Sequence, residues 1–168
     1  MPHTEHPLEM VLDAAGFGIW EYDHVNAQGY WNATLGKLMH ILPERIARLE
    51  DWLDRIHPED RPQVELRMAD AVNGTSPLFQ ARYRFRCGDN QWRWVESRGQ
   101  VVERDADGKP LLTAGIMHDI HACVQAEQAL LGSEERHRIL AEYSPDWQYW
   151  LGNDDRYLYV SSACEVIS

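Results

Sequence analysis

Residues 79–87 read FQARYRFRC, and this stretch decides the class of fold. Every odd-numbered residue from Phe79 to Cys87 is apolar, whereas every even-numbered one is glutamine or arginine. A period of two sends alternate side chains to opposite faces of an extended chain, so the stretch predicts a strand with one buried and one solvated face. An α-helix would scatter these apolar side chains around its surface, because its period is about 3.6 residues.

The residues that follow predict two further strands, each reached through a tight turn. The turn at 88–90 leads into 91–95, and a second turn at 105–108, with the sequence DADG, leads into 111–120. Turn residues of this kind between apolar stretches are typical of antiparallel hairpins. We therefore expect a meander of three long strands after residue 78.

The residues at the start of the chain predict a helix and a hairpin. Apolar residues at helical spacing favour a leading helix at 7–15, which Gly16 would end. Aromatic and β-branched residues then predict strands at 17–23 and 30–32, joined by a polar turn.

Helices are expected between this hairpin and the meander. Several short ones fit residues 33–52, and a longer one is expected over 58–72, with Pro58 at its first position. Glu59 and Asp60 would then lie at the positive end of that helix. Two strands, helices and three more strands give an α+β fold, in which helices cover one face of an antiparallel sheet.

The rest of the chain predicts a linker and a partial repeat. The residues after 121 favour a helix. Leu130 belongs to a series of residues spaced alternately three and four apart, which would lie along one side of that helix, so two such helices could pair. The sequence WQY at 147–149 repeats the WEY of 20–22, as a second hairpin would. The expected parts are a domain at 1–121, a helical, coiled-coil-like linker at 122–143 and the truncated start of a second domain at 144–168.

Composition limits the classes of partner. The formal net charge of -11 argues against nucleic acid and against contact with anionic membranes. No apolar run approaches the roughly 20 residues that span a bilayer, so we expect a cytoplasmic location without membrane contact from this stretch. The three cysteines, Cys87, Cys123 and Cys164, are widely separated and are expected to be reduced.

An ordered set of short motifs resembles the PAS family in its PAC-containing form. The resemblance covers nearly all of residues 7–121. The order and spacing of the motifs together are more specific than any single motif. The motifs are Trp52-x-x-Arg55-Ile56-His57-Pro58-Glu59-Asp60, Tyr83-Arg84, Trp92-Arg93-Trp94-Val95, Arg98-Gly99, Asp107-Gly108-Lys109-Pro110 and Gly115-Ile116-Met117-His118-Asp119-Ile120.

This resemblance implies a five-stranded antiparallel sheet with helices on one face, followed by a linker helix. It also implies a regulatory module that forms a homodimer and drives an effector domain further along the same chain, either a histidine kinase or a GGDEF-type diguanylate cyclase. Signal coupling is expected at Asp119, Ile120 and Leu130. Asp119 would accept hydrogen bonds from backbone N–H groups at the start of the outgoing helix.

Large side chains of the expected core are the candidates for lining a ligand pocket. Aromatic residues in a small core usually only pack, so a bound cofactor remains unknown: none, or a small metabolite, is expected. The candidates are Trp20, Tyr22, Trp31, Met39, Tyr83, Phe85, Trp94 and Met117.

Specific cofactors, metals and catalysis are disfavoured. Light-sensing flavin domains need a cysteine in the helical region, and haem-binding relatives use a histidine in the long helix, but residues 33–72 have no cysteine and 58–72 no histidine. His118 and His121 lack further metal ligands at suitable spacing. No nucleophile with a nearby base is evident, so this stretch is not expected to be an enzyme. The longer protein to which it belongs is expected to be one.

Two functional hypotheses follow. In the first, the chain is a sensory and dimerisation module whose linker helix transmits a change of state to the effector. In the second, it is a ligand-free structural domain that mediates protein–protein interaction.

Overall fold

The computed structural model describes residues 7–143, 149–151 and 156–160. The chain separates into two compact units, one up to Ala122 and the other from Cys123 onward, and each is considered by itself. In the described residues, no helix combines the length and the apolar character needed to cross a membrane.

The first unit begins with a helix and a hairpin, as expected. Helix α1 (Pro7–Ala14) ends where Gly16 takes a φ of +76°, a conformation that glycine adopts without steric cost. Strands β1 (Gly18–Asp23) and β2 (Gln28–Trp31) follow. The helical elements after them are α2 (Ala33–Met39), the 3₁₀ turn η1 (Pro43–Arg45), α3 (Leu49–Leu53) and α4 (Arg61–Val72).

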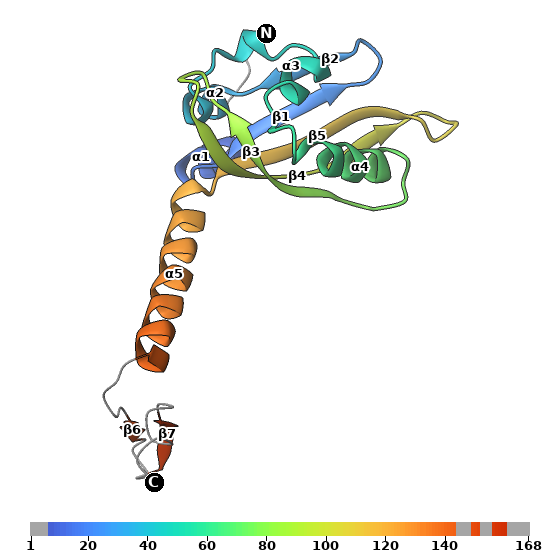
Figure 1. Ribbon diagram of the computed structural model, residues 1–168. Coiled ribbons are helices and arrows are strands. Elements are labelled where there is room, and N and C mark those ends of the chain that lie inside the picture. The colour runs from blue at the N-terminus through green and yellow to red at the C-terminus, as the bar shows by residue number, and fades with distance from the viewer. Residues whose placement is uncertain (1–6, 144–148, 152–155, 161–168) are drawn as a thin grey trace. The chain divides into compact units, whose positions relative to one another are not determined.

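Within this unit β1 and β2 join three later strands in one antiparallel sheet. The later strands are β3 (Phe79–Arg86), β4 (Trp92–Arg104) and β5 (Pro110–Asp119). The order across the sheet is β2-β1-β5-β4-β3, so the first hairpin lies beside the last strand (Figure 1). The predicted sheet of five antiparallel strands is confirmed.

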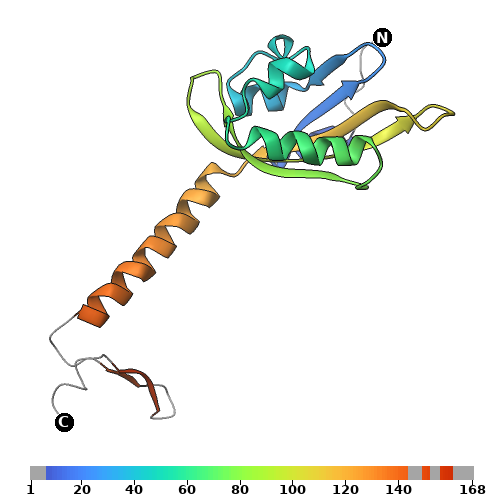
Figure 2. The same ribbon diagram turned by 45° about the vertical axis from the view of Figure 1, so that its right-hand side comes forward.

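The two faces of β3 also agree with the prediction. Phe79, Ala81, Tyr83 and Phe85 are buried, whereas the residues between them are partly or fully exposed. Helices α2, α3 and α4 lie on one side of the sheet (Figure 2), and the main core forms between them and its inner face. The helices and the segment between α2 and α3 contribute to this core the side chains of Leu35, Met39, Ile41, Ile46, Leu53, Val64 and Ala71.

Helix α4 begins three residues later than expected. Pro58 and Glu59 lie in a turn, in which the carbonyl oxygen of His57 accepts the N–H groups of Asp60 and Arg61. The prediction was wrong here because the carboxylates of Glu59 and Asp60 bind an arginine of β3 instead of the helix end, which fixes the turn outside the helix.

Helix α5 (His121–Tyr143) spans the expected linker and starts within one residue of its predicted boundary. Beyond it, β6 (Tyr149–Leu151) and β7 (Tyr157–Val160) form an antiparallel pair, where a second hairpin was expected. Trp147, Gln148 and Cys164 lie outside the described residues. That this segment starts a second domain of the same kind stays a prediction.

Candidate functional site

The inner face of the sheet forms the floor of a cavity. Cross-strand partners share a face of a sheet, and one row of partners crosses β2, β1, β5, β4 and β3 in turn. The row consists of Trp31, Trp20, Gly115, Gly99 and Phe79. The two glycines therefore leave open space between aromatic side chains.

The indole ring of Trp20 occupies that space. A Cβ at Gly99 would lie 2.5 Å from carbons of this ring, and a Cβ at Gly115 would overlap both the ring and the carbonyl oxygen of Arg98. Trp20 meets Phe79 edge to face, with ring centroids 6.2 Å apart. In the described part of the chain its buried Nε1–H has no hydrogen-bond partner. Packing on the glycines therefore holds the ring.

Two further rows complete the floor. On one side Tyr22 pairs with Thr113, which pairs with Val101; on the other, Met117 pairs with Ser97. The roof comes from α3, α4 and the segment between η1 and α3, and the volume of the cavity is about 350 Å³. This volume lies within the range of small-molecule sites, roughly 300–1,000 Å³. Roof side chains include Ile46, Leu49, Trp52, Met68, Ala71 and Val72.

A polar cluster lies at one end of this apolar cavity. The Nε1–H of Trp52 donates to the hydroxyl of Tyr83 at 3.2 Å, and the Tyr83 hydroxyl lies 3.8 Å from the sulfur of Met117. Ser97 also interacts with the Tyr83 hydroxyl, and it is only 1% exposed. Burial raises the pKa of Tyr83, so its hydroxyl stays protonated.

The outer part of the cavity carries a second polar contact. Nε2 of His24 lies 2.8 Å from the hydroxyl of Thr113, and the His24 ring meets Tyr22 edge to face. Burial lowers the pKa of His24, which favours the neutral imidazole. The charged residues that line the cavity, Glu21 and Arg48, are both exposed.

The structure brings together only part of the predicted set of pocket residues. Trp20, Tyr22, Trp31 and Met117 line the cavity. Met39, Tyr83 and Phe85 do not line it, because they are fully buried in the core beside it. Trp94 does not line it either, because it pairs with Arg84 on the opposite face of the sheet, where the Arg84 guanidinium lies 5.5 Å from its ring centre.

Sequence reasoning did not identify several of the lining residues. Ser97 lies between charged residues and gave no signal of its own, whereas Phe79 belongs to the buried half of the alternating strand. Glycines inside strands often mark a close approach, so Gly99 and Gly115 could have indicated where a large side chain lies on the sheet.

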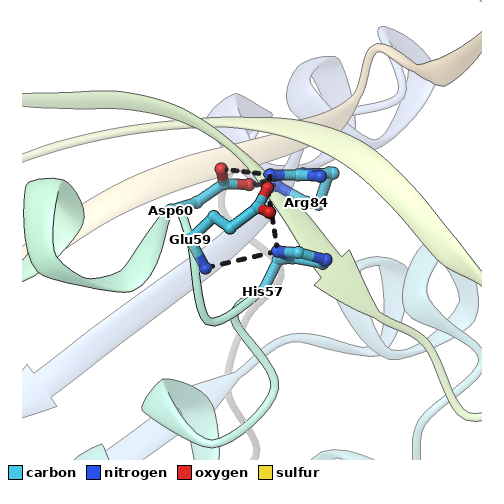
Figure 3. Close-up of polar contacts among 4 residues, drawn as sticks. All are labelled: His57, Glu59, Asp60 and Arg84. Carbon is cyan, nitrogen blue, oxygen red and sulfur yellow. Dashed lines mark hydrogen bonds and ion pairs between the residues drawn. The ribbon is translucent and has the colours of Figure 1, made fainter.

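Two of the family-like motifs, the one that ends at Asp60 and the one that contains Arg84, meet at the edge of the sheet (Figure 3). Nε and Nη2 of Arg84 bind the two carboxylate oxygens of Asp60 at 2.9 and 2.7 Å, and Nη2 also reaches Glu59 at 2.7 Å. The backbone N–H of Arg84 donates to Asp60 as well, and its carbonyl oxygen accepts the N–H of His57. This network gives hydrogen-bond partners to the backbone N–H and carbonyl oxygen of Arg84 at the edge of β3, where both groups would otherwise be unpaired.

The end of β5 is joined to the start of α5 by hydrogen bonds. Oδ1 of Asp119 accepts the N–H of His121 at 2.7 Å, the contact expected of a residue that caps the outgoing helix. The N–H of Ile120 donates to the carbonyl oxygen of Trp94, and Oδ2 of Asp119 lies 3.5 Å from Arg93. Leu130, further along the helix, is 61% exposed. A role of these residues in signalling stays a prediction.

Haem needs an axial ligand such as a histidine, and a flavin–cysteine adduct needs a thiol beside the flavin. That either cofactor is unlikely stays a prediction. Among the described residues that line the cavity, the imidazole is that of His24, which is hydrogen-bonded to Thr113. The free thiols that the structure describes, Cys87 and Cys123, are not among the lining residues. Likewise, no group of three or more His, Cys, Asp or Glu in the described ranges is placed to hold a metal ion.

Comparison with known proteins gives one family and several relatives. The family described as "PAS fold" matches residues 28–117. The two-component sensor PprA of Pseudomonas aeruginosa is 32% identical over 92 residues, which is 55% of this chain and 10% of PprA. The probable diguanylate cyclase DgcE of Escherichia coli is 27% identical over 132 residues, 79% of this chain and 12% of DgcE. The chain thus spans about a tenth of the length of these relatives.

Solved structures agree in fold. A sensory box histidine kinase/response regulator from Burkholderia thailandensis superimposes with a TM-score of 0.67 at 26% identity, covering 80% of this chain and all of the solved one.

Proposed function

The chain belongs to the PAS family, and from this premise we propose that residues 1–121 sense a small ligand and regulate an effector domain in the same protein. The PAS unit is a sensory module and not a catalytic one. The names of the relatives support a histidine kinase or a GGDEF-type diguanylate cyclase as the effector. The proposed location is the cytoplasm.

The observation that carries this proposal is the course of β5. Thr113 and Met117 of this strand line the cavity, and Asp119, two residues after Met117, caps the outgoing helix. A ligand that contacts Met117 can therefore change the relative stability of two arrangements of the β5–α5 junction. A differential affinity equivalent to about 1–3 kcal/mol suffices for such regulation.

The linker and the dimer complete the proposal. Helix α5 exposes Leu130, Leu131 and Ile139, which would pack against the same helix of a second copy. The segment at 144–168 would begin a second PAS domain, and α5 would pass the change of state to it and on to the effector.

We expect Asp119→Ala to uncouple the sensor from the effector. The substitution removes the oxygen that accepts the His121 N–H, so the sheet loses one of its side-chain hydrogen bonds to the start of α5. In the whole protein, the difference in kinase or cyclase activity between free and ligand-bound states should fall at least about fivefold. Asp107→Ala, in the exposed β4–β5 turn, is the matched control. Unchanged regulation in the Asp119 variant would contradict the proposed route.

A ligand-free interaction domain is the second candidate. Exposed Met10 and Val11 on α1 favour it, because both offer apolar surface for another protein. Native mass spectrometry and an absorption spectrum of freshly purified protein separate the two. A stoichiometric added mass supports the sensor, and a colourless dimer of bare chain mass supports the interaction domain.

A further inference from the structure

One hydrogen bond between β4 and the start of α5 is made by a side chain in place of a strand. Strand β5 pairs with β4 up to Asp119, opposite Val95, and then ends. At the neighbouring position of β4, the carbonyl oxygen of Trp94 still accepts a main-chain donor, the N–H of Ile120. The N–H of Trp94 donates instead to Nδ1 of the His121 imidazole, at 3.4 Å. A histidine ring therefore takes the place of a strand carbonyl at the first residue of α5.

This contact requires one protonation state of the ring. An imidazole nitrogen accepts a hydrogen bond only while it carries no proton, so the His121 ring must be neutral, with its hydrogen on Nε2. Protonation would place an N–H at Nδ1, facing the N–H of Trp94, and two donors cannot share a hydrogen bond. At 3.4 Å the bond is also longer than the 2.7 Å bond from the His121 N–H to Asp119. It is therefore the contact of the junction that a change of charge breaks most easily.

The charges around the ring give its protonated form a second position. His121 opens α5, where the helix dipole disfavours a positive charge. Asp119 of β5 and Arg93 of β4 lie 3.5 Å apart at this junction, and Arg84 of β3 lies over the ring of Trp94. The carboxylate of Asp119 attracts an imidazolium. A protonated ring that leaves β4 can therefore turn toward Asp119, where it competes with Arg93.

From this geometry we propose that His121 makes the junction between the sheet and α5 sensitive to pH. The neutral ring holds β4 to the first residue of the helix, whereas the protonated ring releases β4 and pairs with Asp119. Histidine side chains ordinarily change charge between about pH 5 and 8, so the change needs no extreme of pH. This inference rests on the route proposed above, from β5 through the junction to α5, and it adds the proton as a second input to that route.

Two-dimensional NMR of the ¹⁵N-labelled chain tests the proposal at both partners of the bond. Near pH 8 the ring spectrum of His121 should show its hydrogen on Nε2. As the pH falls to about 5, the amide signal of Trp94 should move with the same midpoint as the His121 ring. The protection factor of that amide against hydrogen exchange should fall at least about threefold, as expected for the loss of one weak hydrogen bond. A His121 hydrogen on Nδ1 near pH 8, or a Trp94 amide that does not follow the ring, would overturn the proposal.

Two variants assign the response to one histidine. In His121→Asn a carbonyl oxygen, which does not titrate, can stand near the place of Nδ1, so the Trp94 amide should keep its protection from about pH 8 to about pH 5. His118→Asn is the matched control, because His118 lies close by on β5 but its Nε2 faces Glu96 at 3.7 Å. This control should retain the wild-type response. A response that persists in His121→Asn, or one that disappears in His118→Asn, would show that His121 is not the group that acts.

The NMR measurements need neither a ligand nor an effector, so they separate this inference from the sensory function. A Trp94 amide without a pH response refutes the pH sensitivity, and the Asp119→Ala experiment still tests the sensory function on its own. In the whole protein, the ratio of kinase or cyclase activity between wild type and His121→Asn should change at least about twofold between about pH 7.5 and about pH 6. An equal ratio at both pH values would refute regulation through His121.

Discussion

Gly115→Ala should destabilise the domain by about 3 kcal/mol and lower its melting temperature by roughly 10 °C. The added Cβ would overlap the carbonyl oxygen of Arg98 and the ring of Trp20. Neither can give way easily, because Arg98 belongs to β4, which is paired on both sides, and Trp20 is packed against Phe79. Thermal unfolding followed by circular dichroism measures the effect.

Gly132→Ala is the matched control for this substitution. Gly132 lies within α5, and a Cβ there meets no atom within 4 Å. Alanine favours a helix over glycine, so this variant should be unchanged or slightly more stable. Trp20→Ala combined with Gly115→Ala should not restore stability, because the truncation removes packing from the core and the overlap with Arg98 remains. A Gly115→Ala variant as stable as wild type would show that Trp20 does not lie on the glycine pair.

The fold could be predicted well where local pattern determines it. The alternation in Phe79–Arg86 depends only on side chains within that strand, so both its faces were predicted correctly. The start of α4 depends instead on Arg84, which lies 24 residues after Asp60 in the sequence. A contact of this range cannot be inferred from the local signals for a helix start, which Pro58 and its acidic neighbours supplied.

Only part of the cavity lining could be predicted from the sequence. A lining residue must lie on the inner face of the sheet, and it must also border open space. Trp20 and Trp31 pair across the first hairpin and share its inner face. Trp94 could not be assigned a face from the sequence, since the register that pairs it with Arg84 emerges only when the sheet forms. Size and aromatic character identified core residues such as Tyr83, but they did not reveal that glycines would open the floor.

Asp60→Asn should cost about 2 kcal/mol of folding free energy at neutral pH. The aspartate side chain is 17% exposed, and it binds both the guanidinium and the backbone N–H of Arg84. An amide can still accept the N–H but does not pair with the positive charge. The control is Glu59→Gln, because Glu59 binds the same arginine yet is 74% exposed, so its loss should change stability little.

The cost of Asp60→Asn should also depend on pH. The hydrogen bonds from the Arg84 side chain, with further help from its backbone N–H, hold the pKa of Asp60 below its ordinary value. A carboxylate with a lowered pKa in the folded state stabilises the fold above its unfolded pKa of about 3.9, and this stabilisation is lost as the pH falls through the folded pKa. Urea unfolding at a series of pH values should therefore show wild type and Asp60→Asn converging in acid. A stability difference that stays constant from neutral pH down to strong acid would mean that the Asp60 carboxylate does not hold the edge of β3 by its charge.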